Sequence, residues 1–354
     1  MQEPLLRKLD WSNVADLTTF SVNNPEFKKV RKQGVFHSAC KSCRVYEENN
    51  MPSMRTQNMY YRDEVNTEVN TVVDIRHVDL RLSNKCNLQC KMCYPTDSDQ
   101  LVKLSRELTS LGISNPLEHQ LPDNTSEDIS KLLDLVLQLP NLEAIRFAGG
   151  EPFIMPEVEQ FLYKLVAQGR TNINIEFMTN CTSAKPKVIA LLEQFDHVDL
   201  MCSIDGVEDT LEYQRYPARW KTIETNFKRM YNSKCNTRIV PCIGLLNYLD
   251  LDRFFAWAAQ YPKSIVTFNE IQEPSFLNFR LIPSDIRPKT FNPGINVSHN
   301  WYNFISNKMH ETREPTLDEC NKLLAHSRMW DYRCNEKFLD RYPWASYIIE
   351  KAKV

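Results

Sequence analysis

Long apolar runs are absent from this 354-residue sequence, because charged residues interrupt every apolar stretch. No segment approaches the roughly 18 to 20 consecutive apolar residues that cross a bilayer, so we expect a soluble protein with no membrane partner. The first residues, MQEPLLRKLDWSNVADL, also lack the basic start and apolar stretch of a secretory signal peptide. The sequence therefore predicts a reducing, cytoplasmic location.

An excess of charge of either sign is missing as well. Lys and Arg number 43 against 45 Asp and Glu. Such balance creates no overall field that would attract nucleic acid or an anionic membrane surface. The sequence also lacks the basic and aromatic clusters with which proteins bind single strands. We therefore expect no nucleic-acid partner.

Cysteine is the residue type that is well represented, with 11 in the chain. An odd count in a long, aromatic-rich sequence does not fit a disulfide scaffold. Three of them, Cys86, Cys90 and Cys93, form the pattern CxxxCxxC directly after a β-rich segment. Three thiolates on one short loop can hold three irons of a [4Fe-4S] cube and leave the fourth iron open to a ligand that is not protein. The alternative, structural zinc, needs four ligands, and no His or fourth Cys lies near enough in sequence.

From about residue 77 onward, short β-rich segments alternate with amphipathic helical segments. The predicted strands are residues 77–83, 142–150, 172–180, 197–205, 238–246 and 264–272. The predicted helices between them are residues 127–139, 156–167, 186–195, 219–231 and 250–260. This alternation indicates right-handed crossovers and a parallel sheet in an α/β fold.

In these features the chain resembles the radical S-adenosylmethionine (SAM) enzymes, whose signature is CxxxCxxC at the end of the first barrel strand. The resemblance implies a partial (β/α)6 TIM-type barrel, since six repeats are too few to close an eight-stranded one. It also implies that SAM chelates the open iron through its amino and carboxylate groups. An electron from the cluster then cleaves SAM to methionine and a 5'-deoxyadenosyl radical, which abstracts hydrogen from a substrate. An electron donor such as flavodoxin or ferredoxin is an expected partner.

The expected domain division has three parts. Residues 1–75 form an N-terminal region with a CxxC pair, residues 76–282 the radical SAM core barrel, and residues 283–354 a helical C-terminal extension with aromatic anchors. A long insertion at about residues 97–141 holds two amphipathic helical patterns. We expect it to form a cap or an extra helix.

The segment AGGEP follows the second predicted strand. Gly149 and Gly150 permit a close backbone approach, and the Glu151 carboxylate can accept hydrogen bonds from a cationic amine. The resemblance implies that this segment contacts the SAM amino group. The alternative is a tight strand-to-helix turn with a capping Glu.

Three further residues are expected at the ends of later strands. Asn180, in MTNCT, is expected beside SAM or substrate, or as the cap of the next turn. Ser203 and Asp205, in SIDG, lie two residues apart and so on one side of a strand, where they could hold the ribose hydroxyls and carboxylate end of SAM. Arg215 is the candidate partner of the methionyl carboxylate, and Arg219 competes with it.

The remaining cofactor contacts are expected around adenine. Many relatives have an aromatic residue before the third cysteine, where this chain has Met92, with Tyr94 just after it. A Met side chain can also pack on adenine. In the fifth strand, Cys242, Gly244 and Asn247 occupy the place where the family contributes backbone contacts to adenine, although the usual glycine-rich pattern is weak.

A second metal site is a candidate at Cys40 and Cys43, which have CxxC spacing. Their segment resembles the CxxC found before the barrel in relatives with auxiliary iron-sulfur domains of the SPASM or twitch type. A second cluster would need further thiolates, for which Cys320 and Cys334 are the candidates, and structural zinc is the alternative. Small core residues or inert thiols are expected at the other positions, Cys181, Cys202, Cys235 and Cys242.

The leading hypothesis is thus a cytoplasmic radical SAM enzyme that acts on a peptide or protein side chain, since relatives with auxiliary clusters often modify peptides. A small metabolite or sugar nucleotide is the alternative substrate, and activation of a glycyl-radical enzyme is a third. A hypothesis from a different class is a non-catalytic zinc-binding adaptor. That hypothesis predicts a colourless, zinc-containing protein that does not bind SAM.

Overall fold

The computed structural model describes residues 44, 47, 48, 75–112, 126–288, 296, 297, 302, 303, 307 and 311–352. The candidate ligands Cys40 and Cys43 lie outside the described residues. The described residues belong to two units, one within Met1–Val78 and Asn124–Ile145 and the other within Asp79–Asp123 and Arg146–Val354. All the site residues that are discussed below belong to the second unit.

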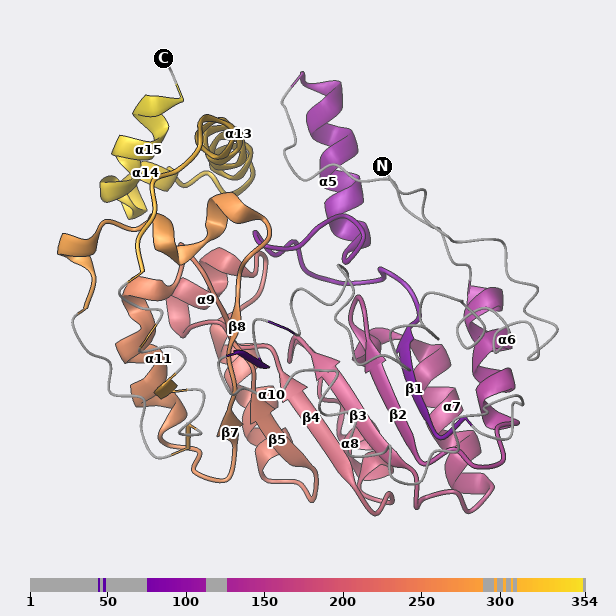
Figure 1. Cartoon of the computed structure of the whole chain (residues 1–354). Helices are drawn as coiled ribbons and strands as arrows, with labels where there is room; N and C mark the ends of the chain where they lie inside the picture. Colours follow the sequence, from indigo (N-terminus) through magenta and orange to yellow (C-terminus); the bar gives the residue numbers. More distant parts are fainter. Residues whose placement is uncertain are drawn as a thin grey trace. The chain divides into compact units, whose positions relative to one another are not determined.

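Within the described residues, six strands form one sheet whose strand order follows the chain, β1-β2-β3-β4-β5-β7 (Figure 1). The pairing from β3 through β4 and β5 to β7 is parallel. The parallel α/β fold that the sequence predicts is therefore confirmed. The strands are β1 (His77–Arg81), β2 (Ala144–Ala148), β3 (Asn174–Thr179), β4 (Val198–Cys202), β5 (Asn236–Ile239) and β7 (Ile265–Val266).

The fifth and sixth predicted strands were wrong as single strands, because each is broken in two. β5 ends at Ile239, and Pro241 separates it from β6 (Cys242–Ile243). Proline has no backbone N–H and cannot extend the hydrogen-bonded ladder. β6 pairs instead with β8 (Asn269–Glu270) in a separate two-stranded sheet, so the sixth predicted strand is divided between β7 and β8.

Helices separate the strands as predicted, with ends that differ by a few residues. α9 (Glu208–Gln214) is a helix that the sequence pattern did not predict. In the part of the chain that the structure describes, no helix is both long and apolar enough to cross a membrane. The helices after the strands are α6 (Ser126–Leu137), α7 (Pro156–Ala167), α8 (Pro186–Leu192), α10 (Trp220–Tyr231) and α11 (Leu251–Ala258), and the 3-10 turns are η3 (Pro152–Ile154), η4 (Tyr248–Asp250), η5 (Ser275–Leu277), η6 (Phe279–Leu281), η7 (Ser284–Ile286) and η8 (Pro343–Ala345).

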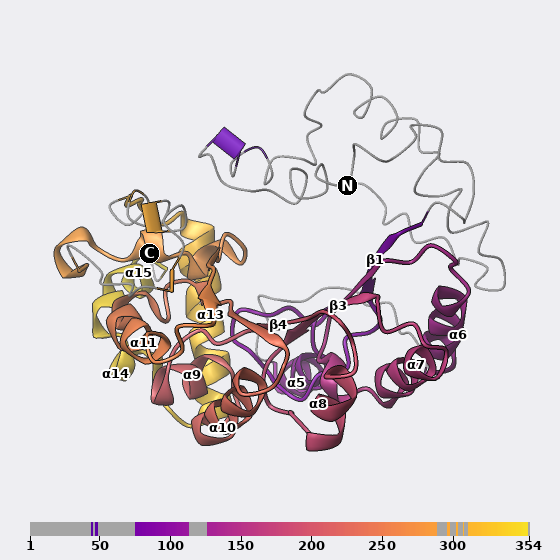
Figure 2. The same cartoon turned by 90° about the horizontal axis from the view of Figure 1, so that it is seen from below.

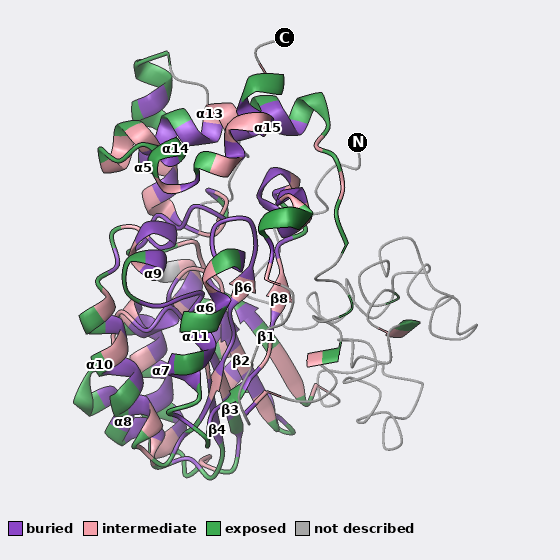
Figure 3. Ribbon diagram, turned by 90° about the vertical axis from the view of Figure 1, so that its left-hand side faces the viewer, coloured by how far each residue is buried: buried purple, intermediate pink, exposed green. Residues whose placement is uncertain are grey.

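One face of the sheet packs on helices through an apolar core. Phe147 in β2 stacks on Phe177 in β3 with ring centroids 4.8 Å apart, and it meets Phe161 of α7 edge-on at 6.0 Å. Figure 2 shows α7, α8 and α10 along this side of the strands. In Figure 3 buried and intermediate residues alternate along the strands, while exposed residues lie on the outer sides of α8 and α10. Burial of this apolar face is the main force that holds helices on the sheet.

The opposite face of the sheet carries charged side chains, because alternate residues of a strand point to opposite faces. Arg146 Nε lies 2.9 Å from Glu176 Oε1, and Arg238 Nη2 lies 3.3 Å from Asp199 Oδ2. Burial raises the pKa of Glu176. In barrel-type folds the face away from the helices lines the interior, so these charged side chains lie on the inner face, together with Met178 and Met201.

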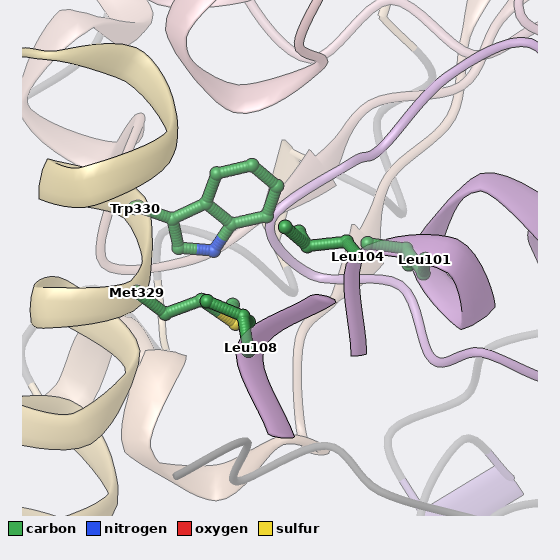
Figure 4. Close-up of a cluster of buried hydrophobic side chains, with 5 residues drawn as sticks. All are labelled: Leu101, Leu104, Leu108, Met329 and Trp330. Carbon is green, nitrogen blue, oxygen red and sulfur yellow. The ribbon is translucent and has the colours of Figure 1, made fainter. Parts of the chain in front are cut away.

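The insertion and the C-terminal extension meet in a second apolar cluster. α5 (Asp99–Ser110), from the insertion, presents three leucines at the i, i+3, i+7 spacing of one helix face. α13 (Leu317–Cys334), which is followed by α14 (Phe338–Arg341) and α15 (Ser346–Lys351), supplies the partners. Figure 4 shows this cluster, which consists of Leu101, Leu104, Leu108, Met329 and Trp330.

Candidate functional site

The CxxxCxxC loop connects the end of β1 to the start of α5. Its backbone is hydrogen bonded to the segment that ends α9. Gln89 N donates to Tyr216 O at 2.6 Å, and Lys91 N donates to Gln214 O at 2.8 Å. At its start the loop is held by Asp99, whose Oδ1 accepts from Cys86 N at 3.0 Å. Contacts within this chain therefore hold the loop at Cys86 and between Cys86 and Cys93.

The three cysteine thiols of the loop are shielded from water to different degrees. Cys86 and Cys90 are buried, and Cys93 is half-buried. Burial raises the pKa of the Cys86 thiol to about 12. The pKa of Cys90 is lowered instead, mainly because its sulfur accepts a hydrogen bond from the Cys93 thiol, and the positive charge of Arg215 acts in the same direction. Metal binding would replace the thiol protons, since thiolates are the ligand form.

Two side-chain donors lie beside these sulfurs. Asn180 Nδ2 is 3.7 Å from Cys86 Sγ, and Arg215 Nη1 is 3.9 Å from Cys90 Sγ. Hydrogen bonds to the sulfurs of an iron-sulfur cluster help to set its reduction potential. A loop with three thiols and flanking donors therefore fits a [4Fe-4S] cluster.

A mononuclear metal ion makes a different demand on geometry. Among the described residues, no three His, Cys, Asp or Glu side chains surround a position that one metal ion could occupy. A cubane holds its thiolates on separate irons, so Cys86, Cys90 and Cys93 need not converge on one point. The soft thiolate donor set is the kind that iron-sulfur clusters use.

The two glycines of AGGEP allow this segment to lie directly against the cysteine loop. Gly149 and Gly150 have φ values of 77° and 56°. A Cβ atom on Gly150 would lie 2.3 Å from the carbonyl oxygen of Lys85, which also accepts a hydrogen bond from Glu151 N at 2.8 Å. The close backbone approach that the sequence predicts is thus made with the residue before Cys86.

Substitution of Gly150 by Ala is therefore expected to displace the cysteine loop. We expect Gly150→Ala to lose most of its bound iron after anaerobic reconstitution, and to lose more stability than the roughly 1–2 kcal/mol that a left-handed conformation costs a residue with a side chain. Gly169→Ala is the matched control, since Gly169 has a φ of 68° and a Cβ atom added there would meet nothing within 4 Å. Iron content per chain and urea denaturation measure both effects. Equal iron content in the two variants would contradict this account.

Glu151, three residues after the end of β2, is fully buried. Its Oε1 accepts from Phe153 N at 3.1 Å and from Thr179 Oγ1 at 2.9 Å, while Oε2 accepts from Asn180 N at 2.6 Å. Glu151 thus caps η3, as the alternative interpretation predicts. Burial raises the pKa of Glu151 to about 7, although the three hydrogen bonds lower it. A carboxylate has about four acceptor positions, so one is left for a further donor.

Asn180 is linked to the loop by more than its contact with Cys86. Its Nδ2 donates to Asn87 Oδ1 at 3.1 Å, and its Oδ1 accepts from Thr182 N at 2.9 Å and from Thr182 Oγ1 at 2.6 Å. The capping role that the sequence allows is thus present together with the contact to the cysteine loop. Asn87 and Thr182 were not among the predicted site residues, because short polar side chains in loops give no distinctive signal.

Asp205 and Arg215 form a buried ion pair. Arg215 Nε donates to Asp205 Oδ2 at 2.6 Å, and Cys242 N donates to Asp205 Oδ1 at 2.8 Å. Burial lowers the pKa of Arg215, but Asp205 and Cys90 outweigh it and hold that pKa well above its usual value. Asp205 therefore fixes the guanidinium that approaches Cys90.

The prediction that Ser203 and Asp205 lie on one side of a strand was wrong, because β4 ends at Cys202. Both residues lie in the loop that follows, where alternation no longer sets the direction of side chains. Asp205 is buried and Ser203 is only half-buried. Ser203 N donates to Thr179 O at 2.8 Å, which keeps this loop beside the end of β3.

Arg215 and Arg219 differ sharply in their surroundings. The Arg219 side chain is 78% exposed, and its Nη1 lies 3.5 Å from Glu212 Oε2. The Arg215 side chain is only 8% exposed and lies next to Cys90. The structure therefore brings Arg215, and not Arg219, to the cysteine loop.

The residues that we expect around adenine occupy two places. Met92 is buried and Tyr94 is half-buried in the cysteine loop. Asn247 Nδ2 donates to Asp205 O at 2.6 Å and to Cys242 O at 2.9 Å, and Asn247 Oδ1 accepts from Gly244 N at 2.8 Å. Asn247 therefore holds the β6 region against the Asp205 loop.

Cys320 and Cys334, the candidates for the further thiolates of an auxiliary cluster, cannot both belong to one cluster, so at most one of them could serve. Both lie on α13, fourteen positions apart. At about 1.5 Å of rise per residue, a helix places them about 21 Å apart. Cys320 is buried, and Cys334 lies half-buried at the end of the helix.

Two buried polar residues at the loop were missed by the sequence argument. Lys91, between two of the cysteines, is 1% exposed. Gln214 is fully buried, and in the part of the chain that the structure describes its side-chain amide has no hydrogen-bond partner. Lys and Gln are normally surface residues, so no pattern in the sequence distinguishes these two.

Comparison with known proteins locates the chain among its relatives. The model of the Radical SAM superfamily matches residues 80–257. The radical SAM cyclopropyl synthase TigE of Paramaledivibacter caminithermalis is 28% identical over 158 residues, 43% of this chain and 32% of that protein. An uncharacterized protein of Methanocaldococcus jannaschii is 24% identical over 136 residues, 38% of this chain and 40% of that protein. The chain thus spans less than half the length of the curated relatives it matches.

Solved structures are matched as well. Native anSMEcpe with bound AdoMet has a TM-score of 0.42 and 14% identity, over 73% of this chain and 61% of that one. SuiB of Streptococcus suis bound to S-adenosylmethionine has a TM-score of 0.41 and 11% identity, over 90% of this chain and 59% of that one.

The superfamily model covers half of the chain, and the matched residues include the three loop cysteines, Glu151 and Arg215. This chain belongs to the Radical SAM superfamily.

Proposed function

We propose that this chain is a radical SAM enzyme that holds a [4Fe-4S] cluster at Cys86, Cys90 and Cys93 and acts on a peptide or protein. When bound, the cluster and SAM supply one electron and a 5'-deoxyadenosyl radical that abstracts hydrogen from the substrate. The observation that carries the proposal is the CxxxCxxC loop, whose sulfurs have Asn180 and Arg215 as neighbours.

The residues around the loop have distinct roles in this proposal. Glu151 keeps one acceptor position open, which we assign to the ammonium group of SAM. Arg215 uses Nε for Asp205 and Nη1 for Cys90, so Nη2 remains for the methionyl carboxylate. Burial of Cys86 and Cys90 excludes water from the sulfurs. Gly149 and Gly150 let the Glu151 segment reach the loop.

The substrate assignment is supported by two observations. The segment around Cys40 and Cys43 resembles that of relatives with auxiliary clusters, which often modify peptides. The charged inner face, with Arg146, Glu176 and Arg238, suits a polar substrate such as a peptide.

The similarity to a cyclopropyl synthase favours an enzyme over a zinc-binding adaptor. We assign the electron to a small donor protein such as flavodoxin or ferredoxin.

The experiment that tests this function is formation of 5'-deoxyadenosine by anaerobically reconstituted protein with dithionite and SAM, followed by mass spectrometry. We expect product well above that of Cys86→Ala, because that variant lacks one cluster ligand. Lack of product from protein whose [4Fe-4S] cluster is reducible, together with no SAM binding to that cluster, would refute the proposal. Lack of product with SAM bound means that cleavage requires the substrate.

The same preparation tests the substrate class. Mass spectrometry of molecules that the purified chain releases on denaturation is expected to detect a peptide. A released sugar nucleotide or small metabolite, in place of a peptide, would contradict the peptide assignment and leave the SAM chemistry in place.

A further inference from the structure

Lys91 lies inside the cysteine loop, directly after Cys90, yet it is among the largest fully buried side chains of the described residues. Its backbone is held on both sides. Lys91 N donates to Gln214 O at 2.8 Å, and Lys91 O lies 2.9 Å from His326 Nε2 of α13. The position of this lysine is therefore determined by α9 and α13 together.

Aromatic rings surround the ammonium group of Lys91. Its Nζ lies 3.4 Å from the ring centroid of Tyr213 in α9 and 4.7 Å from that of Trp330 in α13. It also lies 3.8 Å from Cys334 Sγ. Aromatic faces attract a cation, and most strongly where water is excluded. The box formed by Tyr213, Trp330 and Cys334 thus holds the charge at a defined position.

No carboxylate neutralises Lys91 at close range. In the described ranges, no Asp or Glu oxygen lies within ion-pair distance of its Nζ. Cys334, whose sulfur is 3.8 Å away, acts on it first, Glu336 and Asp331 act from farther away, and Arg341 opposes them. A buried cation without a close counter-ion is unfavourable unless another negative group lies near.

Besides the thiol of Cys334, the cluster would be a negative group beside Lys91, since two of its ligands flank this residue in the sequence. Lys91 lies between Cys90 and Cys93 in the sequence, and Cys93 packs against the apolar cluster to which Trp330 belongs. Trp330 therefore lies over the Lys91 ammonium and also belongs to the apolar cluster against which the iron ligand Cys93 packs. Thiolate ligation gives an iron-sulfur cluster negative charge, and net charge near the cluster is one determinant of its reduction potential.

We propose that the buried ammonium of Lys91, held by Tyr213 and Trp330, raises the reduction potential of the [4Fe-4S] cluster at Cys86, Cys90 and Cys93. This inference rests on the proposed function. One electron from an external reductant adds a negative charge to the cluster, and a fixed positive charge nearby stabilises that reduced state. Tyr213 and Trp330 are positioning residues, because they act through Lys91. The C-terminal extension thereby contributes to the properties of the cluster through α13.

The test is a redox titration of the reconstituted full chain with dithionite, in which the electron paramagnetic resonance signal of the reduced cluster is followed. We expect Lys91→Met to lower the equilibrium constant for one-electron reduction about tenfold, which corresponds to a potential about 59 mV more negative. Lys91→Arg keeps the charge and is expected to stay close to the wild type. Lys85→Met is the matched control, because it removes an exposed lysine next to Cys86.

The outcomes separate the two proposals. A wild-type chain that assembles no [4Fe-4S] cluster contradicts the proposed function itself. An unchanged potential in Lys91→Met, or an equal shift in Lys85→Met, overturns the role of Lys91 alone. If Lys91→Met does not retain iron, Lys91→Gln decides, with the same shift expected. If neither neutral variant retains iron while Lys91→Arg does, the charge serves assembly of the cluster, and the proposal is overturned.

Discussion

Replacement of Cys86, Cys90 or Cys93 by Ala is expected to abolish SAM cleavage. Each substitution removes one of three thiolates from a loop that has no fourth cysteine or histidine nearby in sequence. The cluster would lose a ligand to one of its irons. Iron and sulfide content after anaerobic reconstitution, together with 5'-deoxyadenosine formation in the presence of dithionite and SAM, measures the effect. We expect the product to fall to the level of a reaction without enzyme.

The matched control for these variants is Cys235→Ala. Cys235 is also buried, and its backbone nitrogen donates to Ser233 Oγ before the start of β5. This substitution removes a buried thiol outside the cysteine loop, so iron content and SAM cleavage are expected to stay near those of the wild type. Full activity in any one of the three loop variants would exclude the mechanism, whatever the control shows.

Arg215→Met is expected to destabilise the protein by about 3–5 kcal/mol, the usual cost of leaving one partner of a buried ion pair without the other. Asp205 is fully buried, and Arg215 Nε donates to its Oδ2 at 2.6 Å. Without the guanidinium, the carboxylate keeps one side-chain hydrogen bond among the described residues, which Cys242 N donates. Urea denaturation of the iron-free protein measures the free energy of unfolding.

Arg219→Met is the matched control, because its side chain is 78% exposed and its ion pair is made at the surface. We expect a change within about 0.5 kcal/mol. The double variant Asp205→Leu with Arg215→Met removes both charges and is expected to recover part of the lost stability, since an apolar pair needs no counter-charge. Equal stability of the Arg215 and Arg219 single variants would mean that the buried ion pair contributes no more to the free energy of unfolding than the exposed one.

The fold could be predicted largely because hydrophobic periodicity is a local property. The segments that became β1 to β4 have short β-rich patterns, and the helix at α7 begins with Pro156 at its first position, a local start signal that the structure keeps. The fifth and sixth strands were wrongly predicted as single strands. Pro241 interrupts the fifth, and the second half of each belongs to a separate sheet, as β6 and β8. Which sheet a strand joins depends on its neighbours in space. Pro241 marks the end of β5, but it does not indicate that the next segment, β6, pairs with β8.

The candidate site was predictable where ligand chemistry imposes spacing, as at Cys86, Cys90 and Cys93. Glu151 and Asn180 could also be selected, because each follows a predicted strand at the edge where parallel strands end together. Their mutual hydrogen bond, from Asn180 N to Glu151 Oε2 at 2.6 Å, could not. The SAM-binding roles assigned to these residues stay predictions, as does the division into three domains.

By itself, the sequence determined the α/β class, the order of the elements and the cysteine loop, because these depend on periodicity and on spacing within short segments. Only the tertiary structure decided that Arg215 rather than Arg219 reaches Cys90, that Asp205 fixes it, and that Cys320 and Cys334 are too far apart to share a cluster. It also decided that Lys91 is buried between α9 and α13. The reason is that burial and charge pairing arise between residues far apart in the chain. Lys91 and Trp330, for example, are 239 positions apart in the sequence, and they meet because the cysteine loop is held to α9 and α13.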